Sequence, residues 1–269
     1  MSTADFTDRR TTFDAVALQY DDARPAYPEQ LIHTVLTYAG VHEGARALEI
    51  GAGTGQATLQ FAWRGIGVHA VEPGPAMADL IRERFDGTDL DVTVETADLE
   101  SAVIQPGAYD LVFAATSWHW LTPVVRWQRV SEALRPGGTV AAFWHVPHWR
   151  RTDLRQELDV VYANSGADLT QMGPMADTEI ENAAFLRDWV ADVHDPSAFN
   201  DFRGAEYRWS QRLDAADYTS LLGTYGDHLA LDPDVRSRLF EGVTAVIDAH
   251  GGQLELHYTT HLMVARAAG

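Results

Sequence analysis

The sequence has 269 residues, which suits one large domain or one domain with an inserted cap. Its hydrophobic content of 46% can build a sizeable core, and its formal net charge of −19 disfavours nucleic acids and anionic membranes as partners. Cysteine is absent, which excludes disulfides and thiolate metal sites, and neither a membrane-spanning apolar run nor a signal-peptide pattern is present, so we expect a cytoplasmic protein.

The region from Ala45 to His145 alternates strand-like and helix-like segments. Short apolar or alternating runs predict five strands, at Ala45–Ile50, Gly67–Val71, Leu90–Ala97, Tyr109–Thr116 and Thr139–His145. Helical spacing predicts helices between them, at Thr54–Trp63, Pro75–Phe85 and Pro123–Leu134, the last stopped by Arg135-Pro136-Gly137-Gly138. Strands separated by helices imply a parallel sheet that is covered on both faces.

The flanking regions differ in character. The first 40 residues read as helices with a break at Arg24-Pro25 and Pro28, and residues 146–204 read as helical or irregular, which predicts a cap inserted after the fifth strand. Later segments predict further strands and helices in alternation, at Tyr207–Leu213 and Leu254–Val264 for strands and at Ala215–Tyr225 and Pro233–His250 for helices. We expect all of these parts to form one domain over residues 1–269.

The sharpest local signal is a glycine-rich turn between a strand and a helix, Leu48-Glu49-Ile50-Gly51-Ala52-Gly53-Thr54-Gly55. Glycines let the backbone turn tightly and let a ligand approach it closely. Glu49 distinguishes between ligands, because its carboxylate would repel a pyrophosphate but would suit the α-ammonium group of S-adenosylmethionine (SAM). Dinucleotide-binding loops look similar, and a plain strand–helix connection is the structural alternative.

Carboxylates also follow the second and third predicted strands. Glu72 can accept hydrogen bonds from both hydroxyls of a ribose, as carboxylates also do in NAD sites. Asp98 can accept a hydrogen bond from the exocyclic amine of adenine while Leu99 packs on the ring, although a lone aspartate is also a common turn or helix cap. Together these residues indicate a nucleoside at the carboxyl edge of the sheet.

The order and spacing of five runs resemble those of the class I SAM-dependent methyltransferases: LEIGAGTGQ, VEPGPAM, TADLE, YDLVFAATSWHW and LRPGGTVAAFWH. More narrowly, FDAVALQYDDARPAYP and TSWHWL are similar to a bacterial and fungal group that includes trans-aconitate methyltransferases and many natural-product enzymes. The resemblance covers Phe13–His145. It implies an α/β fold with a Rossmann-like, seven-stranded, mostly parallel sheet, an antiparallel last strand and helices on both faces.

The resemblance also implies SAM as the cofactor. Glu49 and the glycines would flank its methionine moiety, the residues after the second and third strands would hold its ribose and base, and Thr116 would lie near the sulfonium. The predicted cofactor-binding set is Tyr20, Arg24, Glu49, Gly51, Gly53, Glu72, Pro73, Met77, Asp98, Leu99 and Thr116.

The amino-terminal segment, residues 1–40, resembles a family element that folds over the cofactor as a lid. Tyr20, Arg24 and Tyr27 lie in it. Arg24 could pair with the carboxylate of SAM or with an acidic substrate, because a guanidinium matches the fork of a carboxylate. The structural alternative is a helix held by surface ion pairs.

The acceptor is expected beside Ser117-Trp118-His119-Trp120, which follows the fourth strand. Aromatic walls exclude water, and His119 has a pKa range suited to accepting a proton, so it is the candidate general base. A packed histidine that orients the loop is an equal alternative, and a carboxylate acceptor would need no base. The predicted substrate set is Trp118, His119, Trp120, His145, Tyr225 and His228, and no carboxylate cluster supports a metal site.

These features predict methyl transfer from SAM to a small molecule at an O, N or C nucleophile, with a carboxylate or hydroxyl favoured. An NAD(P)-dependent oxidoreductase would explain the glycine loop and Glu72, but not Glu49 or the G-x-G-x-G spacing. A SAM-binding protein without transferase activity is the third hypothesis. We expect neither nucleic acid nor membrane as a partner, and the sequence makes no prediction of oligomeric state.

Overall fold

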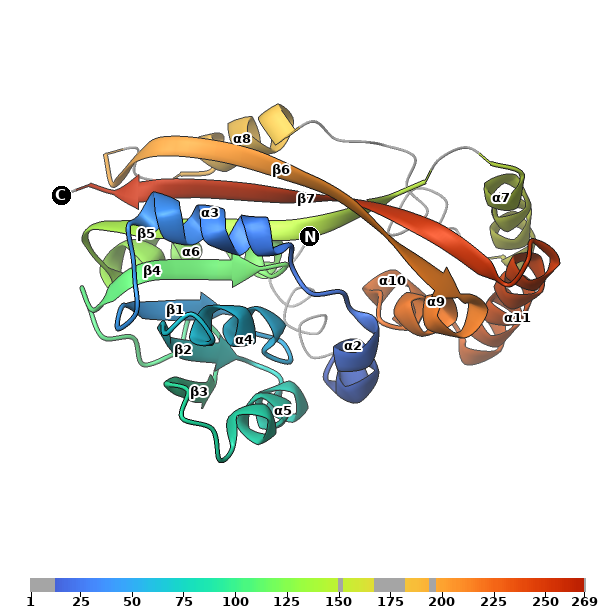
Figure 1. Ribbon diagram of the computed structural model, residues 1–269, viewed down its shortest axis with the longest axis horizontal. Coiled ribbons are helices and arrows are strands. Elements are labelled where there is room, and N and C mark those ends of the chain that lie inside the picture. The colour runs from blue at the N-terminus through green and yellow to red at the C-terminus, as the bar shows by residue number, and fades with distance from the viewer. Residues whose placement is uncertain (1–12, 150–151, 167–181, 194–196, 269) are drawn as a thin grey trace.

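A computed structural model describes residues 13–149, 152–166, 182–193 and 197–268 of the chain. Its centre is a seven-stranded sheet in the order β3-β2-β1-β4-β5-β7-β6 (Figure 1). The strands are β1 (Arg46–Ile50), β2 (Gly67–Glu72), β3 (Val92–Thr96), β4 (Tyr109–Ala115), β5 (Leu134–His148), β6 (Phe199–Asp214) and β7 (Gln253–Ala267). Pairs among β1 to β5 are parallel, and β7 is antiparallel to both β5 and β6. The predicted Rossmann-like sheet with an antiparallel last strand is therefore confirmed.

Helices of the described region cover both faces of the sheet and its carboxyl end. They are α2 (Ala17–Ala23), α3 (Glu29–Ala39), α4 (Gln56–Ala62), α5 (Pro75–Phe85), α6 (Pro123–Ala133), α7 (Asp153–Ser165), α8 (Asn182–Ala191), α9 (Ala215–Leu222), α10 (Gly226–Leu229) and α11 (Pro233–Ala249), with 3₁₀ turns η1 (Asp14–Val16) and η2 (Trp118–Trp120). None of these helices has the length and apolar character needed to cross a bilayer.

The parallel strands are buried on both faces because alternate residues face different helices. Leu48 and Ile50 of β1 pack in one cluster with residues of α6 and α8, whereas Ala47 packs in another with residues of α3 and α4. Ile81 and Phe85 of α5 extend the second layer over β2 and β3. This two-sided burial explains why the strands read as nearly continuous apolar runs.

Strand β5 is longer than predicted at both ends. It starts at Leu134, directly after α6, so the Arg-Pro-Gly-Gly run lies within the strand instead of before it. The pairing of β5 with β4 is irregular at this point and accommodates the extra residues of β5. Tyr109 pairs with Leu134, whereas Leu111 pairs with Thr139. At its far end β5 continues to His148, which pairs with β7.

Strands β6 and β7 carry a second group of helices beyond the parallel strands. They pair over almost their whole length, from Phe199 to Asp214. Figure 1 shows them running past the other strands to α7, α9, α10 and α11. There Leu256 and Tyr258 are buried with apolar residues of α7, α9 and α11. The carboxyl end of the parallel sheet thus faces a helical group held by two long strands.

The segment predicted as a cap, residues 146–204, contains α7 and α8, but its ends belong to strands β5 and β6. Residues 150–151, 167–181 and 194–196 of this segment lie outside the described residues.

The amino-terminal segment contains η1, α2 and α3, separated by the predicted break between Arg24 and Pro28. Residues 1–12 lie outside the described residues. Helix α2 contacts both halves of the molecule, because Asp21 forms an ion pair with Arg84 of α5 and Gln19 Nε2 donates to the Ser220 carbonyl of α9 at 2.8 Å. In Figure 1, α2 lies between the sheet and the helical group.

Candidate functional site

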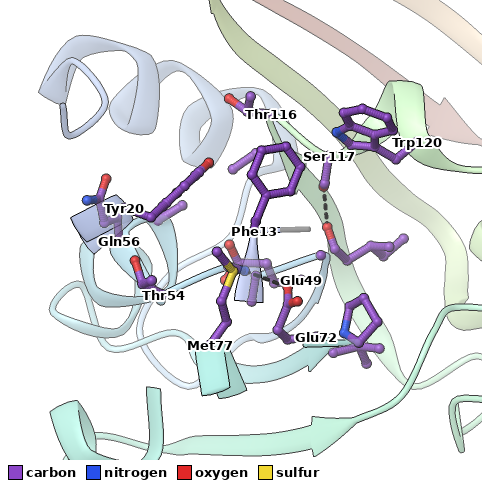
Figure 2. A pocket seen from close by; sticks show the side chains of 18 of the residues that line it. Phe13, Tyr20, Glu49, Thr54, Gln56, Glu72, Met77, Thr116, Ser117 and Trp120 are labelled. Atoms are coloured by element: carbon purple, nitrogen blue, oxygen red, sulfur yellow. Dashed lines mark hydrogen bonds between the residues drawn. The ribbon is translucent and has the colours of Figure 1, made fainter. Parts of the chain in front are cut away.

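A cavity of about 290 Å³ lies at the carboxyl ends of the parallel strands, beside α2 (Figure 2). It brings together most of the predicted site residues: Tyr20, Arg24, Glu49, Gly51, Gly53, Glu72, Pro73, Met77, Asp98, Leu99, Thr116, His119, Trp120, His145 and Tyr225. Two predicted substrate residues, Trp118 and His228, do not line it. Parallel strands end at the same edge of a sheet, which explains why residues far apart in the chain meet here.

The turn after β1 depends on glycine at two positions. Gly51 and Gly53 have φ angles of 66° and 60°, which side chains rarely adopt. A Cβ at Gly51 would lie 2.6 Å from the Cβ of Ser117, whereas a Cβ at Gly53 would meet no atom within 4 Å. Gly51 therefore permits close packing against the end of β4, and Gly53 leaves the backbone open to a ligand.

Glu49 is fully buried in β1 and lines the cavity. Its Oε2 accepts a hydrogen bond from the Thr58 hydroxyl, but no described residue donates to its Oε1. Burial raises the pKa of Glu49 to about 8, against the opposing effect of the Thr58 hydrogen bond. A buried carboxylate oxygen without a donor is costly, and a cationic ligand group in the cavity would satisfy it.

Glu72, at the end of β2, is held by the backbone around the same cavity and is 4% exposed. Its Oε2 accepts from the amide of Gly53 at 2.7 Å, and its Oε1 accepts from the amide of Gly74 at 2.8 Å. Burial raises the pKa of Glu72 to about 7 despite these two hydrogen bonds. Each oxygen keeps a second lone pair, so the oriented carboxylate can still accept ligand hydroxyls. Figure 2 shows Glu49, Glu72 and Met77 on one side of the cavity.

Apolar side chains and one aspartate lie beyond Glu72. Met77 and Leu99 are buried at the cavity wall. Asp98 Oδ1 accepts from the amide of Ser101 at 2.9 Å, so the capping role considered for this residue is present while it also lines the cavity. Asp14, which was not predicted, accepts from the amide of Ala76 at 2.7 Å and thereby anchors η1 to the start of α5.

Thr116 adopts a strained backbone conformation where β4 ends. Its φ of 58° is unusual for a β-branched residue. Its amide donates to the Phe143 carbonyl at 2.8 Å, and its hydroxyl is 2.7 Å from the Tyr27 hydroxyl. The Tyr27 ring in turn stacks on His145, with ring centroids 4.5 Å apart. The strain therefore occurs where β4, β5 and the amino-terminal segment meet at the cavity.

Arg24 connects the amino-terminal segment to the second helical group. Its Nε donates to the Thr224 hydroxyl and its Nη2 to the Thr224 carbonyl, each at 2.8 Å. The guanidinium also lies over the rings of Tyr225, at 4.0 Å, and Tyr20, at 4.9 Å. No carboxylate of the described residues pairs with it, so Arg24 is a cavity-lining cation and not part of a surface ion pair.

The turn η2 directs two of its residues to the cavity. His119 and Trp120 line it, and Phe13 makes an edge contact with Trp120 at a centroid distance of 6.0 Å. The protein surroundings, which partly desolvate the ring, and the Arg126 guanidinium lower the pKa of His119 to about 4. Although the ring is open to the cavity, it is neutral near pH 7.

Trp118, the first residue of η2, points the other way into the core. It is 5% exposed and makes edge contacts with Trp127, at 5.0 Å, and Trp189, at 5.6 Å. Its predicted place in the acceptor pocket is therefore corrected. In a 3₁₀ turn, residues two positions apart lie on different sides, which separates Trp118 from Trp120.

His228 is fully buried between α10 and α7, away from the cavity. Its Nδ1 lies 2.8 Å from Asp227 Oδ1 and its Nε2 lies 2.8 Å from the Tyr162 hydroxyl. Its Nδ1 is thus engaged within α10 and its Nε2 joins α10 to α7, and its predicted substrate role is corrected. Across the described ranges, no group of three histidine or acidic side chains could hold a metal ion.

Several cavity residues lie outside the predicted cofactor and substrate sets. Gln56 Nε2 donates to the carbonyls of Asp21, at 2.9 Å, and Arg24, at 3.0 Å, and the Ser117 hydroxyl donates to the Ile50 carbonyl. Phe13 also lines the cavity. All three lie in or beside the runs that resemble the methyltransferase family. The family resemblance was therefore the signal that could have identified them.

Comparison with known proteins places a methyltransferase domain over residues 47–138. An uncharacterized methyltransferase from Mycobacterium tuberculosis is 32% identical over 138 residues, which cover 51% of this chain and 54% of the relative. The malonyl-[acyl-carrier protein] O-methyltransferase of Geobacter sulfurreducens is 31% identical over 121 residues, or 44% of this chain and 45% of the relative. The chain thus spans about half the length of the curated relatives it matches.

The fold likeness reaches further along the chain. The phosphoethanolamine N-methyltransferase 2 of Haemonchus contortus, solved with phosphomonomethylethanolamine and S-adenosylhomocysteine, has a TM-score of 0.57 and 17% identity, covering 100% of this chain and 61% of that one. At this identity the likeness shows the fold alone. The matches identify residues 47–138 as similar to a methyltransferase domain, whereas the narrower trans-aconitate-like grouping stays a prediction.

Proposed function

We propose that this protein, whose residues 47–138 match a methyltransferase domain, transfers a methyl group from SAM to a small-molecule acceptor. The observation that carries the proposal is Glu49, whose buried Oε1 lacks a donor beside an open glycine turn. A cationic ligand group fits this site and a phosphate does not. The α-ammonium of SAM is such a group.

The chain offers a partner for each part of the cofactor. Glu49 would accept from the ammonium, Arg24 would pair with the carboxylate through the nitrogen that Thr224 does not engage, and Glu72 would accept from the ribose hydroxyls. The other predicted cofactor residues also line the cavity. Part of the wall around the cofactor would be formed by Tyr20, Gly51, Gly53 and Pro73, and the positions of its base and sulfonium would be lined by Met77, Asp98, Leu99 and Thr116. When bound, SAM would supply an activated methyl group: the acceptor lone pair would bond to the methyl carbon, and the electron pair of the broken carbon–sulfur bond would stay on sulfur.

An oxygen nucleophile, carboxylate or hydroxyl, is the favoured acceptor. The described carboxylates that line the cavity come from β1 and the ends of β2 and β3, whereas η2, β5 and the α9–α10 connection contribute His119, Trp120, His145 and Tyr225. An ammonium acceptor would find no counter-charge among the latter residues. The Geobacter relative, which is named a malonyl-[acyl-carrier protein] O-methyltransferase, supports the choice of an oxygen nucleophile. A hydroxyl would pass its proton to His119, whereas a carboxylate has none to lose.

The amino-terminal segment is proposed to act as a lid, and residues 146–204 to contribute to acceptor choice. Tyr20, Arg24 and Tyr27 line the cavity from α2 and the turn after it, which supports the lid. The net charge of −19 supports a small-molecule partner in place of nucleic acid or an anionic membrane, and we retain the cytoplasm as the expected location.

Calorimetry with SAM and S-adenosylhomocysteine tests the cofactor proposal. Glu72→Ala should weaken SAM binding by about 2 kcal/mol, the value of a charge-assisted hydrogen-bond pair. Glu43→Ala, at an exposed position before β1, is the matched control and should bind normally. A folded wild-type protein that binds NADH and not SAM would overturn the proposal in favour of an oxidoreductase.

The transfer itself is tested with isotope-labelled SAM in a cell extract, followed by mass spectrometry. A labelled small molecule formed only with the protein present is the expected result. SAM binding without any labelled product would instead identify a non-catalytic SAM-binding protein.

A further inference from the structure

We infer that Arg126 is a positioning residue that holds the turn η2 in place, so that His119 and Trp120 face the cavity where the acceptor would bind. The inference rests on the proposed methyltransferase function and deepens it, because it assigns the placement of the acceptor to a residue outside the cavity wall. Arg126 lies in α6 and is 8% exposed, although its side chain carries a charge.

The guanidinium of Arg126 joins the two ends of η2. Its Nη1 donates to the Trp118 carbonyl at 2.8 Å and to the Leu121 carbonyl at 3.2 Å. Leu121 directly follows the turn, and the last carbonyls of a helical turn lack partners within it. One planar group therefore fixes both ends of the turn, and His119 and Trp120 lie between those ends.

Asp192 holds Arg126 from the other side. Its Oδ2 accepts from Arg126 Nε at 3.0 Å, from Arg126 Nη2, and from Trp127 Nε1 at 2.9 Å. Asp192 directly follows α8, whereas Arg126 and Trp127 belong to α6. Among the described residues, Asp192 is the carboxylate that forms an ion pair with Arg126. The orientation of the guanidinium thus depends on the end of α8, in the segment proposed to contribute to acceptor choice.

Aromatic packing supports the turn from the core side. The Arg126 guanidinium lies 5.0 Å from the centroid of the Trp118 ring, and Trp118 packs edge-on against Trp127 and Trp189. These contacts involve none of the cavity side chains. Because no ligand takes part in them, the turn is positioned before an acceptor binds.

Arg126 also places a positive charge near His119. Desolvation of the ring and, after it, the Arg126 guanidinium lower the pKa of His119 to about 4. Charge and position can be separated by substitution. Lysine keeps the charge but lacks the planar set of donors that joins Asp192 to two carbonyls, whereas glutamine removes the charge as well.

The first test measures labelled product from isotope-labelled SAM in cell extract, together with the affinity for S-adenosylhomocysteine by calorimetry. Arg126→Lys should lower product formation roughly tenfold or more, because small displacements near the reacting atoms are costly, and should leave the affinity unchanged. Arg126→Gln should show the same loss and should also raise the pKa of His119, measured by an NMR titration, whereas Arg126→Lys should keep it low. Arg135→Gln is the matched control and should change none of these values, since Arg135 pairs with Asp110 where β4 and β5 begin.

The ion pair is tested by a double-mutant cycle. Asp192→Asn should also lower product formation. The double variant Arg126→Gln/Asp192→Asn should be no slower than Arg126→Gln alone, because Asp192 acts through Arg126. Independent, additive losses would overturn the inference, and so would wild-type product formation in Arg126→Lys.

A further measurement does not depend on the acceptor. In nitrogen-15 NMR of the full chain saturated with S-adenosylhomocysteine, the indole signal of Trp120 should shift in Arg126→Lys. The signal of Trp63, which is 67% exposed, should stay in place. Unchanged signals of both Trp120 and His119 would contradict the positioning role. Failure of the wild-type protein to bind S-adenosylhomocysteine, or to form any labelled product, would count against the proposed function instead.

Discussion

At the scale of single residues, Glu49 links ligand binding to protonation. With a pKa of about 8, its carboxyl group is mostly protonated at pH 7 before a ligand binds. A bound ammonium favours the charged carboxylate and lowers this pKa, so binding releases a proton. We expect SAM affinity to increase from about pH 6 to a maximum near pH 8, above which the ligand ammonium itself loses its proton.

Calorimetry in buffers of different ionisation enthalpy measures the released proton directly. Glu49→Gln removes the titrating group while keeping its size, so proton release near pH 7 should fall and binding should weaken. Glu72, with a pKa of about 7, contributes a smaller share that remains in this variant. Undiminished proton release in Glu49→Gln would assign the proton to another group.

The second residue-scale prediction concerns His119. A pKa of about 4 makes its imidazole neutral at pH 7 but weakly basic, and general bases work best with pKa values near the operating pH. A carboxylate acceptor needs no base. We therefore expect His119→Gln to keep SAM affinity and to stay within a few-fold of wild-type turnover on the acceptor found by isotope labelling.

The opposite result would change the assignment. A loss of roughly a hundredfold in turnover, with SAM affinity unchanged, is the effect of removing a general base and would point to a hydroxyl acceptor. In that case activity would be lost as the pH falls through about 4, because only the neutral imidazole accepts a proton.

At the scale of elements, α2 is the part whose mobility should respond to the cofactor. Gln19 and Arg24 fix it to the second helical group, and Gln56 fixes it to the start of α4. If Arg24 also pairs with the cofactor, opening of this segment requires the loss of that pair. Amide hydrogen exchange over Tyr20–Tyr27 should therefore slow when SAM is added.

Helix α11 provides the internal control for this experiment, since none of its residues lines the cavity. Its exchange should change less than that of Tyr20–Tyr27. The proposed lid would be contradicted if Tyr20–Tyr27 exchanged equally with and without SAM under conditions where calorimetry shows binding.

The elements also show what the sequence could and could not predict. Strands β1 and β4 are buried on both faces, so their apolar runs mark them clearly. In β6, by contrast, alternate residues are exposed along an edge strand of 16 residues, and only Tyr207–Leu213 was predicted. Its full length is set by pairing with β7, which lies far along the chain.

The site residues likewise divide into those that the sequence could predict and those that it could not. Most of the predicted cofactor residues stand at the end of a strand or in the turn that follows, where topology fixes the location, so the sequence could predict that they meet at one cavity. The positions of Trp118 and His228 could not be predicted, because the direction of Trp118 depends on turn geometry and the partner of His228, Tyr162, is 66 positions away. The contacts of His145 with Thr260, and through it with Trp209, likewise join residues that no local pattern connects.

At the scale of the whole molecule, charge argues against nucleic acid as the acceptor. The chain has 39 acidic residues against 20 basic ones, all of them arginine. Several of these arginines are already paired on the surface, as Arg82 is with Asp79 and Arg203 is with Asp201. Nucleic-acid binding depends on neutralising phosphates with basic side chains, and this surface would repel them.

We therefore expect no complex with duplex DNA or single-stranded RNA at low micromolar protein, measured by gel shift and fluorescence anisotropy. The measurement should be made at about 50 and 200 mM salt, because phosphate contacts weaken steeply over that range. Adding SAM to both samples tests whether lid closure creates a binding surface. A complex that forms at low salt and dissociates at high salt would show that the arginines gather into a basic surface despite the net charge, and it would move the acceptor from a small molecule to a polynucleotide.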